Sequence, residues 1–142
     1  GSGILAVIAK MLGAKSIIGT DLDENAITAS AENMEANGFA PDIFKVIQGN
    51  IIDDKAVQDE VGYEKYDVVT ANILADVIMP LSKEIAQHIK HGGVFITSGI
   101  IDMKEDAVKK TIMENPELEI VDVSHQGDWV SITAVRKQTR ER

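Results

Sequence analysis

The sequence predicts an α/β fold in which helices cover a mostly parallel sheet that ends in an antiparallel hairpin. Two observations predict this fold. Apolar residues alternate between strand and helix spacing along most of the 142 residues. Near the end, two strand-like runs, residues 118–124 and 129–135, stand together on either side of a loop with hairpin chemistry, residues 125–128 (HQGD). Strands separated by helices form parallel pairs, whereas a short loop joins antiparallel strands.

Composition indicates one globular domain, which we place at residues 1–136, with a polar tail at 137–142. The chain is 44% hydrophobic and 26% charged, as expected of a domain with a sizeable core. It has no cysteine, which excludes disulfides and catalytic thiols, and no apolar run approaches the roughly 20 residues of a membrane span. We expect a cytoplasmic protein. The net charge of −9 argues against nucleic-acid binding and favours a basic partner.

The first third of the chain predicts a glycine turn, a helix, a strand and a second helix. The turn is Gly1-Ser2-Gly3, and the strand at 16–20 leads into Asp21-Leu22-Asp23 about eighteen residues later. The second helix spans 24–37, and Asp23 can cap its first turn. Its expected inner positions are Ala26, Ile27, Ala31 and Met34.

The middle of the chain predicts two strands. The first, at 43–47, ends at Gly49-Asn50, and residues 51–65 predict only a helical turn and loop. The second, at 66–72, has a near-continuous apolar centre, which is typical of a parallel strand covered on both faces.

Two helices and a strand precede the hairpin. The first helix spans 77–90, with Asp76 as its cap and His91-Gly92-Gly93 as its end. A strand at 94–98 follows, and Asp102 and Glu105 have the spacing of a capping box for the last helix, which ends at Asn115-Pro116. The expected inner positions of the two helices are Ile78, Leu81, Ile85, Ile89, Val108 and Ile112.

Glycine and polar residues recur where the predicted strands end. Because ligands of such sheets bind beyond the carboxyl ends of the strands, these residues are candidates for one site. They are Gly1, Gly3, Asp21, Asn50, Asn72 and Ser98-Gly99. Glycines let the backbone approach a nucleotide-type cofactor, and a carboxylate such as Asp21 accepts hydrogen bonds from ribose hydroxyls. Asn50 can meet an adenine amino group or form a turn, and Asn72 can instead cap the turn after its strand.

The pattern resembles the class I S-adenosylmethionine-dependent methyltransferases, which have a Rossmann-like sheet with this terminal hairpin. Within them, residues 67–76 (DVVTANILAD), followed by Gly92-Gly93, Ser98-Gly99-Ile100 and residues 127–130 (GDWV), are similar to the ribosomal protein L-eleven methyltransferase (PrmA) family. The likeness covers residues 1–136. It implies transfer of a methyl group from S-adenosylmethionine to lysine or N-terminal amines of a basic ribosomal protein.

The resemblance also implies roles for particular residues. Gly1 and Gly3 match the last two glycines of the family's turn, Asp21 matches its ribose-binding acid, and Asn72 matches the asparagine between cofactor and substrate amine. An apolar substrate cleft would be lined by Ile73, Leu74, Ile100 and Trp129, although Trp129 can instead pack against the hairpin.

The family's first strand, the start of its glycine turn and its N-terminal recognition domain have no counterpart in these residues. We therefore expect a C-terminal portion of the catalytic domain, with impaired activity, unpaired strand edges and self-association.

Two other functions stay open from the residues alone. A nicotinamide dinucleotide-binding dehydrogenase module also needs glycines and a later acid, but no catalytic Tyr-Lys or His-Asp pair follows here. A non-catalytic, truncated cofactor-binding domain could serve as an interaction module. The three histidines, His88, His91 and His125, lack the spacing of metal ligands, so we expect no metal.

Overall fold

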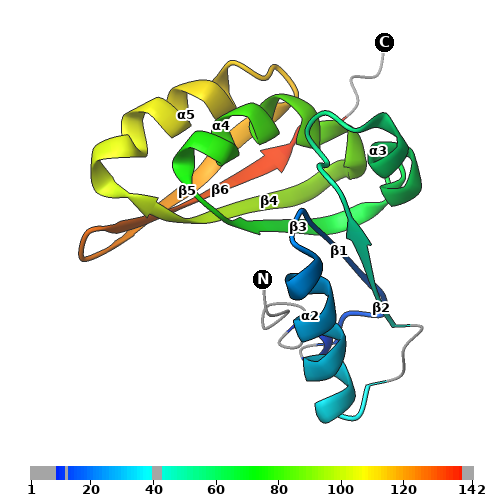
Figure 1. Ribbon diagram of the computed structural model, residues 1–142. Helices are drawn as coiled ribbons and strands as arrows, with labels where there is room; N and C mark the ends of the chain where they lie inside the picture. The colour runs from blue at the N-terminus through cyan, green and yellow to red at the C-terminus, as the bar shows by residue number, and fades with distance from the viewer. Residues whose placement is uncertain (1–8, 12, 40–42, 139–142) are drawn as a thin grey trace. The chain divides into compact units, whose positions relative to one another are not determined.

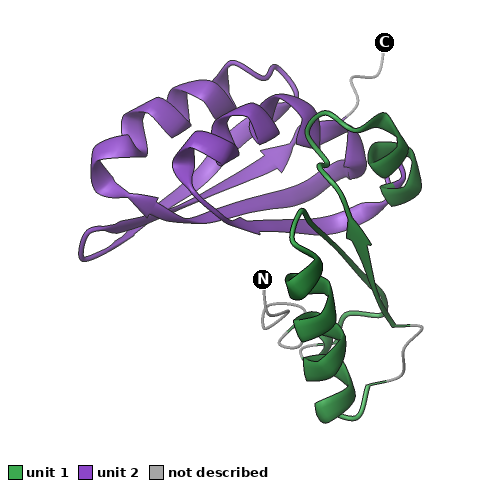
Figure 2. Ribbon diagram, viewed as in Figure 1, with its two compact units in different colours: residues 1–61 green, residues 62–142 purple. Residues whose placement is uncertain are grey.

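A computed structural model of the chain describes residues 9–11, 13–39 and 43–138. The chain divides into two compact units, residues 1–61 (unit 1) and residues 62–142 (unit 2), coloured separately in Figure 2. The expected glycine turn at Gly1 and Gly3 lies outside the described residues. The single domain expected at residues 1–136 stays a prediction.

Unit 1 contains two parallel strands joined by a helical crossover (Figure 1). The strands are β1 (Ile17–Asp21) and β2 (Phe44–Gln48), and the helix is α2 (Glu24–Ala36). Asp21 lies beside Gln48 in the register, so both strands end at the same edge of the pair. There, the backbone N–H of Gly49 donates to the Asp21 carbonyl at 2.9 Å. These elements agree with the predicted ones to within one residue at each end.

The buried stripe of α2 differs from the predicted one. Met34 is buried and Ala26 and Ile27 are half-buried as expected, but Ala31 is exposed and Ser30 is buried instead. The stripe therefore passes through residues 27, 30 and 34, which share a helix face as well as 27, 31 and 34 do. The prediction assigned only apolar residues to the buried face of the helix, so it missed Ser30.

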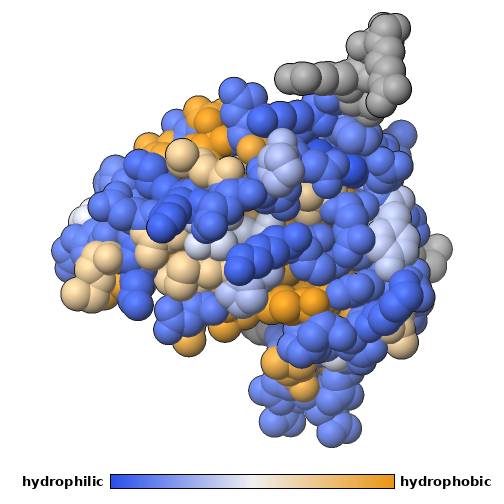
Figure 3. Space-filling model, turned by 90° about the horizontal axis from the view of Figure 1, so that it is seen from above, coloured by the Kyte–Doolittle hydropathy of each residue, from blue (hydrophilic) through white to orange (hydrophobic). Residues whose placement is uncertain are grey.

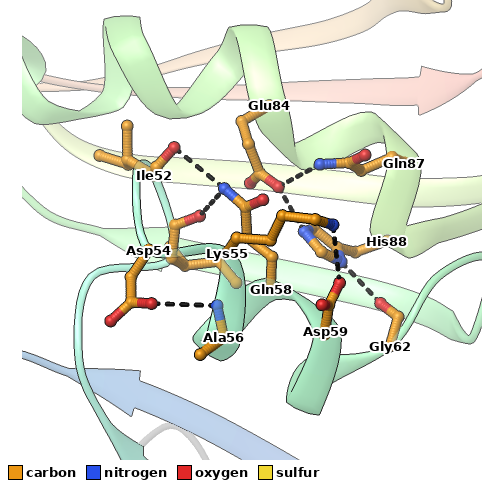
Figure 4. Close-up of polar contacts among 11 residues, drawn as sticks. Ile52, Asp54, Lys55, Ala56, Gln58, Asp59, Gly62, Glu84, Gln87 and His88 are labelled. Atoms are coloured by element: carbon orange, nitrogen blue, oxygen red, sulfur yellow. Dashed lines mark hydrogen bonds and ion pairs between the residues drawn. The ribbon is translucent and has the colours of Figure 1, made fainter.

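Residues 51–65 contain a seven-residue helix, α3 (Lys55–Val61), where only a helical turn and a loop were predicted. The carboxylate of Asp54 accepts a hydrogen bond from the N–H of Ala56 at 3.0 Å, at the start of this helix (Figure 4). The side-chain amide of Gln58 donates to the carbonyls of Ile51 and Ile52 at 3.0 and 3.1 Å. The helix is short, and its buried apolar residues are two valines, so its periodic signal is weak.

Unit 2 contains a four-stranded sheet in the order β3-β4-β6-β5 (Figure 1). Its strands are β3 (Tyr66–Asn72), β4 (Ile89–Ile101), β5 (Leu118–Gln126) and β6 (Trp129–Arg136). β3 and β4 are parallel, and β6 is antiparallel to both β4 and β5. The turn between β5 and β6 is Gly127-Asp128, where Gly127 has φ 59°. The α/β class with a C-terminal antiparallel hairpin is therefore confirmed.

Helices cover one face of this sheet. They are α4 (Ala75–Glu84), the 3-10 helices η1 (Ile85–His88) and η2 (Asp102–Lys104), and α5 (Glu105–Met113). Figure 1 shows α4 and α5 side by side over the strands. All six predicted inner positions are buried: Ile78, Leu81, Ile85, Ile89, Val108 and Ile112. Ile89, however, is the first residue of β4 and does not lie in a helix as predicted. Each of these buried side chains contributes roughly 1.5–3 kcal/mol of burial free energy.

The ends of the two helices correct the predicted boundaries. α4 begins two residues early, so Asp76 lies inside its first turn and the N-cap residue is Leu74. The helix also ends early, and His91-Gly92-Gly93 lies within β4 rather than at a helix end. The predicted capping box is absent from the described start of α5, because Asp102 belongs to η2.

β3 lies at the edge of the four-stranded sheet. Its apolar centre predicted that both faces of the strand are covered, but only one face is buried within unit 2. Val68 is 55% exposed, while Ala71 is buried on the helical side. Continuous apolar sequence therefore indicates a strand here without showing which of its faces is covered within unit 2.

Two buried ionic side chains stabilise unit 2. The ring of His88 bonds through Nδ1 to the carbonyl of Gly62 at 2.6 Å and through Nε2 to Glu84 at 2.5 Å (Figure 4). Arg136 donates to the carbonyl of Ile89 and to Glu117, both at 2.7 Å. Arg136 is thus a buried anchor at the end of β6.

The surface of the chain is mostly hydrophilic on one face (Figure 3). On the face seen in Figure 3, hydrophilic side chains predominate and hydrophobic ones gather in separate patches. Among the described residues, no helix is long and apolar enough to cross a membrane.

Candidate functional site

In unit 1, Asp21 lies at the carboxyl end of β1, where the chain turns into α2. Its Oδ1 accepts a hydrogen bond from the backbone N–H of Asp23 at 3.0 Å. The Oδ1 of Asp23 in turn accepts from the N–H of Asn25 at 2.9 Å, so Asp23 caps α2 as predicted. A carboxylate can accept about four hydrogen bonds. The hydrogen bond from the N–H of Asp23 therefore does not prevent Asp21 from also accepting hydrogen bonds from the hydroxyls of a ligand.

The charge of Asp21 also suits such a ligand. Burial acts to raise the pKa of Asp21, but hydrogen bonds, among them those from the backbone of Asp23 and Leu22, lower the pKa below its usual 3.8. The carboxylate is therefore ionised at neutral pH and accepts hydrogen bonds only.

Asn50 follows β2, next to the carboxyl end of β1. Its Oδ1 accepts a hydrogen bond from the N–H of Ile52 at 2.9 Å, so the side chain shapes the turn before α3. This is the turn role that the sequence left open beside contact with an adenine. The bond uses only one of the carboxamide's polar atoms, and the cofactor role of Asn50 stays a prediction.

In unit 2, Asn72 lies at the carboxyl end of β3, beside Ser98 of β4 in the register. Its side chain does not cap α4, because the N-cap residue Leu74 has no side-chain cap bond. No hydrogen bond joins the Asn72 carboxamide to another residue in the part of the chain that the structure describes. An exposed carboxamide at this place can donate to, or accept from, a ligand.

Gly99 makes room for Asn72. A Cβ atom on Gly99 would overlap the carboxamide oxygen of Asn72 and lie 3.6 Å from its Cγ. Gly99 also has φ 74°, a conformation that L residues rarely adopt. The sequence placed Ser98-Gly99 at the strand ends but gave no sign that residue 99 determines where the side chain of residue 72 lies.

The apolar residues expected around a substrate have different exposures. Ile73, Leu74 and Trp129 are exposed by 38%, 74% and 56%. Ile100, in contrast, has no exposed surface, because it pairs with Val130 on the helical side of the sheet. Its side chain belongs to the core, which corrects its expected place in a substrate cleft.

Three further exposed apolar side chains near these strand ends were not predicted from the sequence as substrate contacts. Val77, Ile101 and Met103 are exposed by 40%, 40% and 78%. The sequence placed Val77 in a helix, put Met103 in the first turn of the last predicted helix and gave Ile101 no element, so apolar type alone gave no signal that these side chains face solvent.

Each histidine contacts a glutamate. The pairs are His88–Glu84, His91–Glu64 and His125–Glu105. Across residues 9–11, 13–39 and 43–138, no group of three or more histidine, cysteine or acidic side chains could hold a metal ion.

The α/β fold with its C-terminal antiparallel hairpin is that of the class I methyltransferases. The model of the ribosomal protein L11 methyltransferase (PrmA) family matches residues 1–137, and the chain belongs to this family. A ribosomal protein L11 methyltransferase of Lachnospira eligens is 61% identical over 137 residues, which are 96% of this chain and 43% of that protein. One of Agathobacter rectalis is 50% identical over 134 residues, 94% of this chain and 41% of that protein.

A solved structure gives the same result. The crystal structure of ribosomal protein L11 methylase from Lactobacillus delbrueckii subsp. bulgaricus has a TM-score of 0.84 and 30% identity, and the match covers 97% of this chain and 66% of that one. The chain thus spans less than half the length of the curated relatives.

Proposed function

We propose that this chain supplies the cofactor-binding and methyl-transfer part of a protein methyltransferase that uses S-adenosylmethionine. The substrate would be ribosomal protein L11, methylated on lysine or N-terminal amines in the cytoplasm. The observation that carries the proposal is the family match over residues 1–137. The same match disfavours a dehydrogenase, which the glycines and Asp21 alone had left open.

The residues present are compatible with this cofactor. When bound, S-adenosylmethionine supplies an electrophilic methyl group on a sulfonium, so the protein needs no metal or covalent nucleophile. Asp21 would accept hydrogen bonds from the ribose hydroxyls through its ionised carboxylate. The backbone of Gly1 and Gly3 would approach the cofactor, and Asn50 would contact the adenine.

Asn72 would orient the substrate amine. An amine attacks through its lone pair, so its hydrogens must be held away from the methyl group. The carboxamide oxygen of Asn72 and the backbone carbonyls of Asn72 and Ile73 are acceptors for those hydrogens. Support comes from the exposed position of Asn72 at the end of β3 and from the space that Gly99 leaves for it.

The apolar side chains would hold the lysine as a neutral amine. Contact with Ile73, Leu74 and Trp129 removes water from the lysine, and desolvation lowers the pKa of an ammonium group. These three side chains are exposed in unit 2 and so are accessible to a substrate. The acidic net charge of −9 favours encounter with a basic protein and disfavours direct binding of nucleic acid.

Calorimetric titration with S-adenosylhomocysteine and, separately, with NAD tests the proposal. We expect binding of S-adenosylhomocysteine and none of NAD. Binding of NAD alone would contradict the proposal in favour of a dehydrogenase module, and binding of neither would favour a non-catalytic interaction module.

A further inference from the structure

We propose that exposed apolar residues of unit 2 form a docking surface for a basic, lysine-containing segment of the protein substrate. We call this surface the apolar rim, and the inference rests on the proposed function. It consists of Ile73, Leu74, Val77, Ile101, Met103 and Trp129. Three of these residues extend the expected contacts beyond the reacting amine, to the polypeptide on either side of it.

Backbone contacts place two members of the apolar rim, Ile101 and Trp129, next to one another. Ile101 and Trp129 are direct partners across β4 and β6 and therefore project from the same face of the sheet. The N–H of Asp102 donates to the carbonyl of Asp128 at 2.8 Å, which joins the segment after β4 to the hairpin turn.

The other side of the rim begins at the end of β3. Lys104 pairs with Asp76 at 3.6 Å, which brings the end of η2 beside the first turn of α4. Leu74 and Val77 lie on either side of Asp76 in the chain. The loop after Asn72, the start of α4, the segment after β4 and the start of β6 therefore border one another.

The exposure of these apolar side chains indicates that another molecule binds over them. Single exposed apolar residues are common, but large ones gathered at one end of a sheet indicate a binding surface. Leu74, Met103 and Trp129 each expose more than half of their surface, at 74%, 78% and 56%. A thioether and an indole also adapt well to varied contacts.

The negative charges around the apolar rim favour a positively charged partner. Asp76, Asp102 and Asp128 are exposed there, and Lys104 is already paired with Asp76. Lysine side chains complement such a surface, because their aliphatic stems pack on apolar groups while the ammonium meets a carboxylate or the face of an indole. A second copy seated on the apolar rim would bring the aspartates of two chains together, and nucleic acid would be repelled there.

The test uses the 142-residue chain with 13C-labelled methionine methyl groups and purified ribosomal protein L11. Met103 is in the apolar rim, whereas Met113, which is 64% exposed, ends α5 and serves as a matched control. We expect the Met103 methyl signal to shift on titration and the Met113 signal to stay. Met103→Lys should weaken binding about fivefold or more, and Met113→Lys should change it less than about twofold. Binding should also weaken with added salt.

Several results would overturn the docking surface. They are equal losses in the two lysine variants, a shift at Met113 alone, or no binding of ribosomal protein L11 at all. A Met103 shift that depends on chain concentration without added substrate would assign the surface to a second copy. Titration of both variants with S-adenosylhomocysteine separates this inference from the proposed function. If both variants bind S-adenosylhomocysteine but lose affinity for ribosomal protein L11 equally, the docking surface is wrong and the proposed function stands.

Discussion

The carboxamide oxygen of Asn72 occupies the space that a Cβ atom on Gly99 would need. Two features favour glycine at residue 99, its φ of 74° and the closeness of the Asn72 side chain, which would have to move to admit a Cβ atom. The proposed amine-orienting group and the glycine that leaves room for it come from neighbouring strands, β3 and β4.

Gly99→Ala should displace the side chain of Asn72. We expect a clear shift of the Asn72 side-chain amide resonances and a stability loss of about 1 kcal/mol or more, from backbone strain and crowding. Gly127→Ala is the matched control, since Gly127 also has a positive φ, 59°, and a Cβ atom there would meet nothing within 4 Å. If both variants leave the Asn72 resonances in place, Gly99 does not position that side chain.

Asp21→Ala should abolish most binding of S-adenosylhomocysteine, because the ribose loses a charged acceptor. Asp23→Ala is the comparison. It removes the cap of α2 and should cost about 1 kcal/mol of stability while leaving the affinity nearly unchanged. Calorimetry measures the affinities and urea denaturation the stabilities. Equal affinity losses in the two variants would show that Asp21 acts only through the turn that it shares with Asp23.

The stability of unit 2 should fall as the pH rises above 6.5. Burial alone lowers the pKa of His88, but its bonds to Glu84 and to the Gly62 carbonyl outweigh burial and raise the pKa above 6.5. A group with a raised pKa stabilises the fold below its unfolded value and loses that contribution as the pH rises through its folded value.

Urea denaturation from about pH 6 to about pH 9 measures this dependence. His88→Gln should remove most of it, and His125→Gln, which changes an exposed histidine, should leave it in place. The same pH slope in wild type and His88→Gln would contradict the assignment to His88.

Loss of Arg136 should destabilise unit 2 by about 1–3 kcal/mol, because its removal leaves the Ile89 carbonyl and Glu117 without their donor. Arg136→Met keeps much of the side-chain volume and isolates the loss of these bonds. The neighbouring exposed Lys137 is the control, and Lys137→Ala should change the free energy of unfolding by less than about 0.5 kcal/mol. A similar small change in both variants would show that Arg136 is not an anchor.

The edge of β3 should make the chain self-associate. Val68 is 55% exposed, and Asp67, the strand's one acidic side chain, is paired with Lys90. Edge strands with little charge pair with other chains. Val68→Lys should lower the apparent mass in analytical ultracentrifugation, whereas Val121→Lys, equally exposed on the more acidic β5, should not. A wild-type chain that stays monomeric with a high, cooperative melting transition would contradict the expectation.

The sequence predicted the fold well where the spacing of apolar residues and the positions of turn-forming residues agreed. Ile78, Leu81 and Ile85 recur at helical spacing and are buried, and Gly127-Asp128 forms the hairpin turn. Helix ends were less predictable. Asp76 resembled a cap but lies inside α4, because the chain enters the helix at Leu74 without a side-chain cap.

Side-chain exposure was the least predictable property. Ile100 and Ile101 are both isoleucines, yet one has no exposed surface and the other is 40% exposed, because successive residues of a strand such as β4 point to opposite faces. A one-residue difference in register exchanges the faces, and sequence type does not encode it. The closeness of Gly99 and Asn72 likewise depends on pairing between strands that are distant in the chain.

Asp21 is proposed to hold the cofactor and Asn72 to orient the amine that it methylates, so both residues should respond to S-adenosylhomocysteine. A titration of the 15N-labelled chain with S-adenosylhomocysteine follows the backbone amide of Asp21 and the side-chain amide of Asn72 in the same spectrum. The account predicts that both signals shift and saturate along a single binding curve. Saturation of one signal while the other stays fixed, or no response from either, would contradict it.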